Sequence, residues 1–117
     1  MTIAELAKDF TDLLKRGDDE VAAKKYNADD IVSYEAQEGP MSVSRGREAL
    51  KQKGDWWREN HEVHGGTVEG PYVNGDQFAV RIKYDLTPKS TGQRVTMEEV
   101  ALYTVKGGKI TEERFFY

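Results

Sequence analysis

The chain has 117 residues, the size of a single domain with one hydrophobic core. Its net charge of -4 argues against nucleic acid as a partner, because domains that bind DNA or RNA need a positively charged surface. Cysteine is absent, which excludes disulfides, thiolate metal sites and a cysteine nucleophile. The first residues lack a signal-peptide pattern, and no apolar run is long enough for a membrane, so we expect a cytoplasmic protein without membrane contact.

Three helices are expected in the first half of the chain. Near the N-terminus, apolar residues recur at helical spacing. Thr2 and Glu5 form a capping box before them, and Gly17 supplies the left-handed stop. A second helix is expected from about Asp19 to Tyr26, and a third from about Arg47 to Asn60.

The rest of the chain consists of strands and turns. The expected strands run over residues 31–35, 62–69, 78–85, 94–105 and 110–117. Residues 28–30 and 87–93 are expected to be turns, 37–44 a loop, and Gly70-Pro71 a break. Helices followed by a meander of antiparallel strands predict an α+β fold.

The last hairpin predicts which strand face is covered. If Val105 lies opposite Ile110, regular antiparallel pairing sets Leu102 opposite Glu113 and Val100 opposite Phe115. The covered face then contains these apolar residues: Phe78, Val80, Ile82, Tyr84, Val100, Leu102, Phe115 and Tyr117. Two carboxylates share it, Glu98 and Glu113, and a carboxylate on an apolar face must be paired, neutral or hydrated. If the pairing register of this strand were shifted by one residue, Glu99 instead of Glu98 would lie on the covered face.

The outer face of the sheet is expected to be polar. It would present Arg81, Glu99, Tyr103 and Arg114. A surface of this kind suits either solvent or a second subunit, and we expect a homodimer through it.

Several short motifs together resemble one known family. They are Gly17-Asp18, residues 26–30 (Tyr-Asn-Ala-Asp-Asp), residues 46–50 (Gly-Arg-Glu-Ala-Leu) and residues 107–110 (Gly-Gly-Lys-Ile). In order and spacing they are similar to the SnoaL-like and ketosteroid-isomerase-like proteins of the nuclear-transport-factor-2-like superfamily. The resemblance covers residues 1–117 as a single domain. It implies a cone-shaped, curved antiparallel sheet wrapped by three helices around a pocket.

The resemblance also implies roles for individual residues. Ketosteroid isomerases carry their general base seven residues after the alanine of the Ala-Asp-Asp motif, and here that position is Glu35. The position of their hydroxyl-donating tyrosine is Phe10, which has no hydroxyl. Glu98 is the acid nearest to their second donor, near Val100. Since that chemistry needs both donors, a steroid isomerase is disfavoured.

The candidate site therefore combines two acids with an apolar lining. Glu35 and Glu98 are the candidate catalytic residues. The candidate substrate-binding residues are Phe10, Trp57, His64, Tyr84, Glu113, Phe115 and Tyr117. The two histidines, His61 and His64, present no metal-ligand pattern, and no cofactor is expected.

Three functions remain open from the sequence. The first is a cofactor-free isomerase, cyclase or hydratase that acts on a small apolar molecule by acid–base chemistry. The second is a non-catalytic binder of a hydrophobic ligand, and the third is a module for dimerisation or partner binding. For each acid, the structural alternative is a solvated carboxylate or a salt bridge.

Overall fold

The structure is a computed structural model that describes residues 1–117. It contains the three expected helices, with bounds close to those predicted: α1 (Ile3–Lys15), α2 (Asp19–Tyr26) and α3 (Arg47–Asn60). The capping box of Thr2 and Glu5 is formed, and Gly17 follows α1 with a φ of 76°. No helix combines the length and apolar character needed to cross a membrane.

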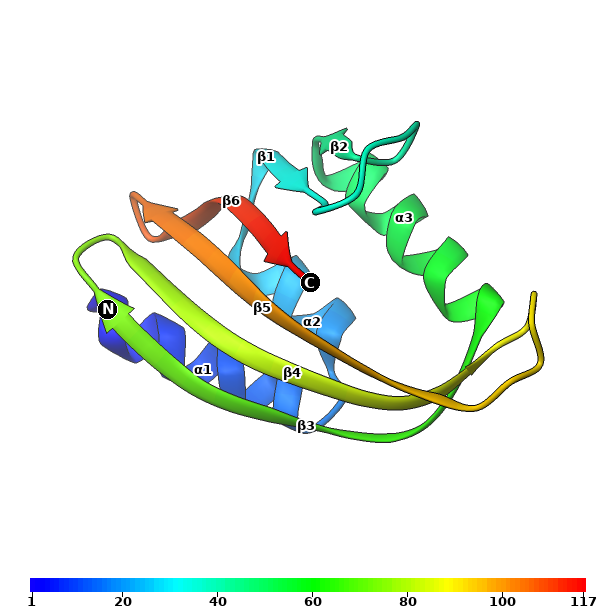
Figure 1. The fold of residues 1–117 in the computed structure, drawn as a ribbon. Helices are drawn as coiled ribbons and strands as arrows, with labels where there is room; N and C mark the ends of the chain where they lie inside the picture. The colour runs from blue at the N-terminus through cyan, green and yellow to red at the C-terminus, as the bar shows by residue number, and fades with distance from the viewer.

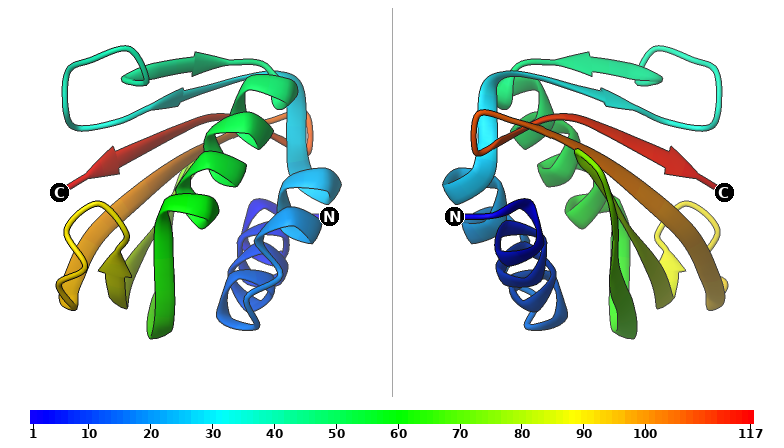
Figure 2. Two further views of the ribbon diagram at one scale, coloured as in Figure 1. Left: turned by 90° about the vertical axis from the view of Figure 1, so that its right-hand side faces the viewer. Right: turned by 90° about the vertical axis from the view of Figure 1, so that its left-hand side faces the viewer.

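Six strands form one curved sheet, against which all three helices lie on the same side (Figures 1 and 2). The strands are β1 (Asn27–Tyr34), β2 (Val43–Arg45), β3 (His61–Asn74), β4 (Gln77–Pro88), β5 (Val95–Lys106) and β6 (Lys109–Phe116). Their order across the sheet is β2-β1-β6-β5-β4-β3. The α+β class is confirmed. The sheet is not purely antiparallel, however, because β1 lies parallel to β6.

Three local predictions about the strands were wrong. Residues 28–30 belong to β1 instead of forming a turn, and residues 43–45 form the short edge strand β2 instead of a loop. The strand β3 continues through Gly70-Pro71, where its pairing with β4 shifts register. In β2 the pairing with β1 supplies backbone hydrogen bonds that outweigh the local turn preference. Residues 28–30 and Gly70-Pro71 lie where the pairing with β6 or β4 shifts register, so at both places the strand continues through an irregularity.

The predicted register of the last hairpin was also wrong, by one residue. Val105 does pair with Ile110, but the next pair is Thr104 with Glu112, so Thr111 is an extra, bulged residue. Beyond the bulge, Tyr103 lies opposite Glu113. Because side chains alternate between faces, this single insertion turns every residue of β5 to the face opposite to the one predicted.

The concave face of the sheet therefore differs from the prediction only in β5. Phe78, Val80, Ile82 and Tyr84 of β4 occupy it as expected. Their partners on β5 are Tyr103, Ala101, Glu99 and Met97. Val100 and Leu102, predicted inside, lie on the convex face with Glu98.

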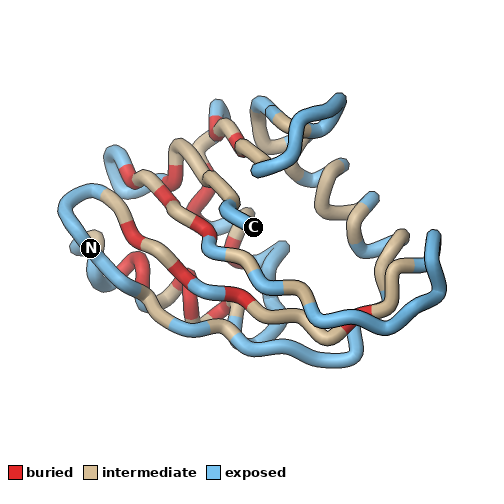
Figure 3. Tube along the Cα trace, in the orientation of Figure 1, coloured by how far each residue is buried: buried red, intermediate tan, exposed pale blue.

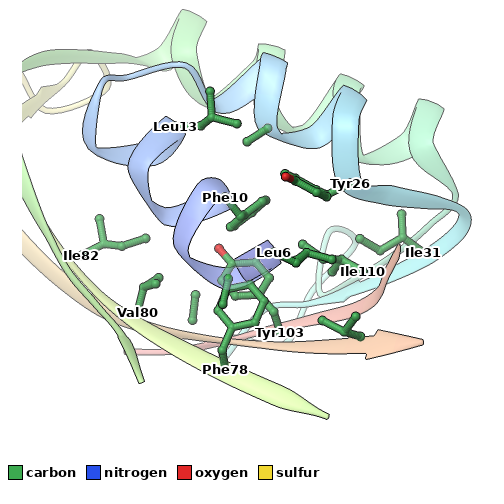
Figure 4. Packing of buried hydrophobic residues seen from close by; sticks show 14 residues of the cluster. Leu6, Phe10, Leu13, Tyr26, Ile31, Phe78, Val80, Ile82, Tyr103 and Ile110 are labelled. Atoms are coloured by element: carbon green, nitrogen blue, oxygen red, sulfur yellow. The ribbon is translucent and has the colours of Figure 1, made fainter. Parts of the chain in front are cut away.

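The core lies where α1 packs on one half of the concave face. Leu6 and Phe10 of α1 join Phe78, Val80 and Tyr103 in a cluster of buried apolar residues (Figure 4). The Phe10 ring centroid lies 4.8 Å from that of Tyr103, in an edge-to-face arrangement. This half of the concave face is filled with side chains.

The other half lies under α3 and is packed much less closely. No residue of α3 is buried, and Figure 3 shows the helix without any fully buried segment. Leu50 and Trp57 are partly buried, and the Trp57 ring lies 5.1 Å from that of Tyr84. Solvent therefore reaches side chains on the concave face below this helix.

Candidate functional site

Glu99 of β5 lies on the concave face, directly opposite Ile82 of β4. No hydrogen bond or ion pair engages its carboxylate. Burial raises the pKa of Glu99 to about 7, with further contributions from the negative charges of Glu35 and Glu113; the Lys53 ammonium partly opposes them. A carboxyl with this pKa exchanges its proton near neutral pH, as a general acid or base must.

Glu113 of β6 is the second carboxylate on this face, in register with Tyr103 on one side and Ser33 on the other. Burial raises its pKa, although Lys53 and the Ser33 hydroxyl act in the opposite direction. Glu113 as a whole residue is partly exposed. A carboxyl whose pKa is raised by burial beside other titratable groups is typical of a functional site.

Lys53 connects α3 to the sheet. Its Nζ donates hydrogen bonds to Ser33 Oγ at 2.6 Å and to Glu35 Oε1 at 2.9 Å. The side chains of Lys53 and Glu35 are only 14% and 23% exposed, so this ion pair is screened less than a surface pair. Tyr117 donates its hydroxyl to the other oxygen of Glu35, at 2.9 Å.

Aromatic rings surround the carboxylates. Phe115 lies opposite Ala101, and Lys53 Nζ lies 5.3 Å from its ring centroid. Tyr84 and Tyr103 face the same side of the sheet as Glu99. Burial raises the pKa of both phenols, so both remain protonated at neutral pH.

Most of the predicted site residues meet on this face. Glu35, Trp57, Tyr84, Glu113, Phe115 and Tyr117 lie on or beside it. We define the inner carboxylate cluster as Glu35, Glu99 and Glu113.

Three predicted site residues lie elsewhere. Glu98 is on the convex face, where Lys83 and Arg81 pair with it and lower its pKa. His64 is exposed, and its Nε2 lies 2.8 Å from the Thr87 hydroxyl. Phe10 is part of the packed core. The prediction for Glu98 failed because the bulge at Thr111 exchanged it with Glu99.

The sequence analysis missed four residues of the site, namely Ser33, Lys53, Glu99 and Tyr103. For Lys53 a signal existed, because it lies three residues after Leu50 and four before Trp57 on the apolar side of the helix. For Glu99 and Tyr103 the only signal was that β5 could also pair with β6 in a register shifted by one residue, and nothing in the sequence favoured that register.

The cluster does not form a metal site, since no three acidic or histidine side chains converge closely enough to hold an ion. A surface hollow of about 330 Å³ lies beside α3 and shares Lys53 with the cluster. Its other lining residues come from the β2 region and one face of α3, and Glu99 and Glu113 are not among them.

Comparison with known proteins identifies the family. A crystal structure from Mesorhizobium loti, described as a candidate SnoaL-like polyketide cyclase and also as a carbohydrate phosphatase, is 77% identical over the whole of both chains, with a TM-score of 0.98. An NTF2-like protein from Burkholderia thailandensis is 18% identical; the match covers 99% of this chain and 90% of that one, with a TM-score of 0.84.

A protein from Catenulispora acidiphila with a ketosteroid-isomerase-like fold, solved in complex with trimethylamine, is 20% identical. That match covers 97% of this chain and 85% of the other, with a TM-score of 0.75. No curated protein matches. The model of the SnoaL-like domain matches residues 1–117, and the chain therefore belongs to the SnoaL-like family.

Proposed function

We propose that the half of the concave face under α3 binds a small, largely apolar molecule and transfers a proton on it without a cofactor. Glu99 is the acid–base group in this proposal. The observation that carries it is the state of Glu99: a partly buried carboxyl, free of hydrogen bonds and ion pairs, whose pKa is raised to about 7. Positioned acid–base groups of this kind contribute roughly 10²–10⁴ to a rate.

The neighbours of Glu99 fit such a reaction. Its ionised form can take a proton from a carbon next to a carbonyl group, and the electron pair then moves to the carbonyl oxygen to give an enolate. Its protonated form can return that proton to another atom of the enolate, which completes an isomerisation. In a cyclisation, the enolate carbon instead forms a bond to a second carbonyl carbon of the same molecule, and Glu99 returns the proton to the alkoxide oxygen that results. Glu35 is a less suitable base than predicted, because Lys53 and Tyr117 already occupy both of its oxygens.

A phosphate ester is disfavoured as the substrate. The inner carboxylate cluster carries three acidic groups against the single ammonium of Lys53, and like charges repel an anion at close range. Phosphate sites normally present arginine, lysine or backbone amides instead. For this chain, the argument favours cyclase-like chemistry over phosphatase chemistry, the two activities named for the Mesorhizobium protein.

Proton transfer can be tested with an enolisable apolar ketone such as β-tetralone in deuterium oxide. We expect the protein to speed the exchange of the hydrogens next to the carbonyl, with a rate that falls as the pH drops below about 7. Glu99→Gln should abolish this acceleration. Glu98→Gln is the matched control on the opposite face and should keep it.

Equal activity of both variants would overturn the role of Glu99. A ketone that binds, with no exchange above that given by free acetate, would favour the second candidate, a non-catalytic hydrophobic-ligand binder. The specific observation in favour of that candidate is Phe10, whose ring lies in the core and provides no hydroxyl.

We also propose that two copies associate through the convex face of the sheet. Val100 and Phe116 lie opposite each other on neighbouring strands, and they are 40% and 49% exposed. Adjacent apolar side chains on an open sheet face are stabilised when a second surface covers them. The homodimer would leave the concave face of each copy free.

A further inference from the structure

We propose that the ligand of the concave face is a small organic cation: an apolar body that carries one ammonium group. This inference rests on the proposed function, because it assigns a chemical class to the molecule that binds beside Glu99. The argument uses the charge balance of the face, an unpartnered tyrosine and the aromatic rings.

Two of the three carboxylates of the concave face form no ion pair. In the inner carboxylate cluster only Glu35 has an ion pair, to Lys53. Neither Glu99 nor Glu113 forms one. On the convex face, in contrast, Glu98 is paired with two cations, Arg81 and Lys83. A partly buried carboxylate is costly without a counter-charge, so a bound cation would be favoured here.

Tyr103 belongs to the packed cluster under α1, but its hydroxyl gives independent support for a ligand on the neighbouring part of the concave face. The residue is only 3% exposed, and its hydroxyl has no hydrogen-bond partner. Thr11 Oγ1 is the only fully buried side-chain oxygen that lacks a partner, so the Tyr103 hydroxyl must still touch solvent. Figure 4 shows this oxygen directed away from the sheet, toward the helix side. Tyr103 lies directly opposite Glu113 on β6, and it shares the concave side of β5 with Glu99.

The tyrosine oxygen can accept a hydrogen bond from an ammonium N–H, and Glu99 can accept another. The aromatic rings of Tyr84, Trp57 and Phe115 offer faces that attract a cation and surfaces that cover an apolar body. A metal ion does not fit, because the acids do not converge on one point. A larger cation, whose charge and apolar body are spread over several ångströms, suits separated carboxylates.

The affinity for a cation should depend on pH. The charged groups that influence Glu99 are Glu35 after β1, Glu113 of β6 and Lys53 of α3. Its titratable neighbours Tyr84 of β4 and Tyr103 of β5 are influenced in addition by Asp19 of α2, and Arg58 of α3 acts on Asp19. Both tyrosines keep their protons at neutral pH, because burial raises the pKa of each phenol. Ionisation of Glu99 therefore adds the charge that a cation needs.

The test uses three ligands with the same apolar body: neohexylamine, neohexyl alcohol and the carboxylate anion of tert-butylacetic acid. The amine stays charged throughout the range, because alkylammonium groups lose their proton near pH 10. Calorimetric titration at about pH 8 should show the amine binding at least about tenfold more tightly than the alcohol. The carboxylate anion should bind more weakly than both, because the acidic face repels it. Toward about pH 5.5 the preference for the amine should shrink as Glu99 becomes protonated.

Glu99→Gln should remove the preference for the amine, and Glu98→Gln should preserve it. The comparison of the three ligands on the unaltered protein does not depend on whether a variant folds. Equal affinity for amine and alcohol, or no binding of the amine at millimolar concentration, would overturn the inference. If this occurs while the protein still catalyses exchange of β-tetralone, the proposed acid–base function stands without a cationic ligand.

Discussion

The two halves of the concave face are built from the same strands but are covered very differently. Under α1, the helix places Leu6, Phe10 and Leu13 against the sheet, and all three are buried. Under α3, no helix residue is buried, and Lys53 reaches the sheet through polar contacts. One half is a core that stabilises the fold. The other half leaves acidic and aromatic side chains available for a ligand.

The largest expected difference between the halves is in stability. Phe78→Ala in the packed half should cost about 3–5 kcal/mol of unfolding free energy, because it leaves a cavity among aromatic rings. Leu50→Ala under α3 should cost only about 1 kcal/mol, because little contact is lost. Denaturant titration of both variants measures the contrast. Similar losses would mean that α3 packs as tightly as α1.

A second prediction concerns the pH dependence of stability. Since Glu99 has a higher pKa in the folded than in the unfolded protein, its contribution to stability decreases as the pH rises between about 4.5 and 7. At about pH 8, Glu99→Gln should therefore be about 1–3 kcal/mol more stable than the unaltered protein. At about pH 4.5 the two should be equal.

Denaturant titrations across this pH range would check the prediction, with Glu98→Gln as the control. Since the pKa of Glu98 is lowered by its cationic neighbours, that variant should not gain stability at high pH. A constant difference between Glu99→Gln and the unaltered protein would show that Glu99 titrates normally.

The third prediction tests the link between α3 and the sheet. Lys53→Met removes two hydrogen bonds and should cost about 1–3 kcal/mol. It should also raise the pKa of Glu99 above its value in the unaltered protein, because an opposing positive charge is lost. Carboxyl NMR can follow this pKa. In the control Lys51→Met, which removes an exposed pair with Asp55, the pKa of Glu99 should not move.

The smallest effect on stability is expected on the convex face. Val100→Lys should change the unfolding free energy of the monomer by less than about 0.5 kcal/mol, because the side chain is exposed. It should nevertheless abolish the proposed homodimer. Light scattering at micromolar concentration checks this, and a monomeric mass for the unaltered protein would refute the dimer.

The sequence was sufficient for the helices and for the inward-facing side of two strands, β4 and β6. The capping box, Gly17 and the apolar periodicity define α1 locally, within a few residues of one another. Alternation from Phe78 to Tyr84 likewise gave the inward side of β4, and Glu113 and Phe115 were placed correctly on β6. Glu35 was found through the resemblance to ketosteroid isomerases, from its spacing to Ala28.

Only the tertiary structure decided which acid of the Glu98-Glu99 pair faces inward. Both residues have the same chemistry, and β5 alternates apolar residues on both faces, with Val100 and Leu102 on one and Ala101 and Tyr103 on the other. Hydrophobic pattern therefore gives no preference between the two registers. The bulge at Thr111 makes the choice, because one inserted residue reverses the parity of the pairing. The sequence determined the fold and its family, whereas a contact between two distant strands determined the acid of the site.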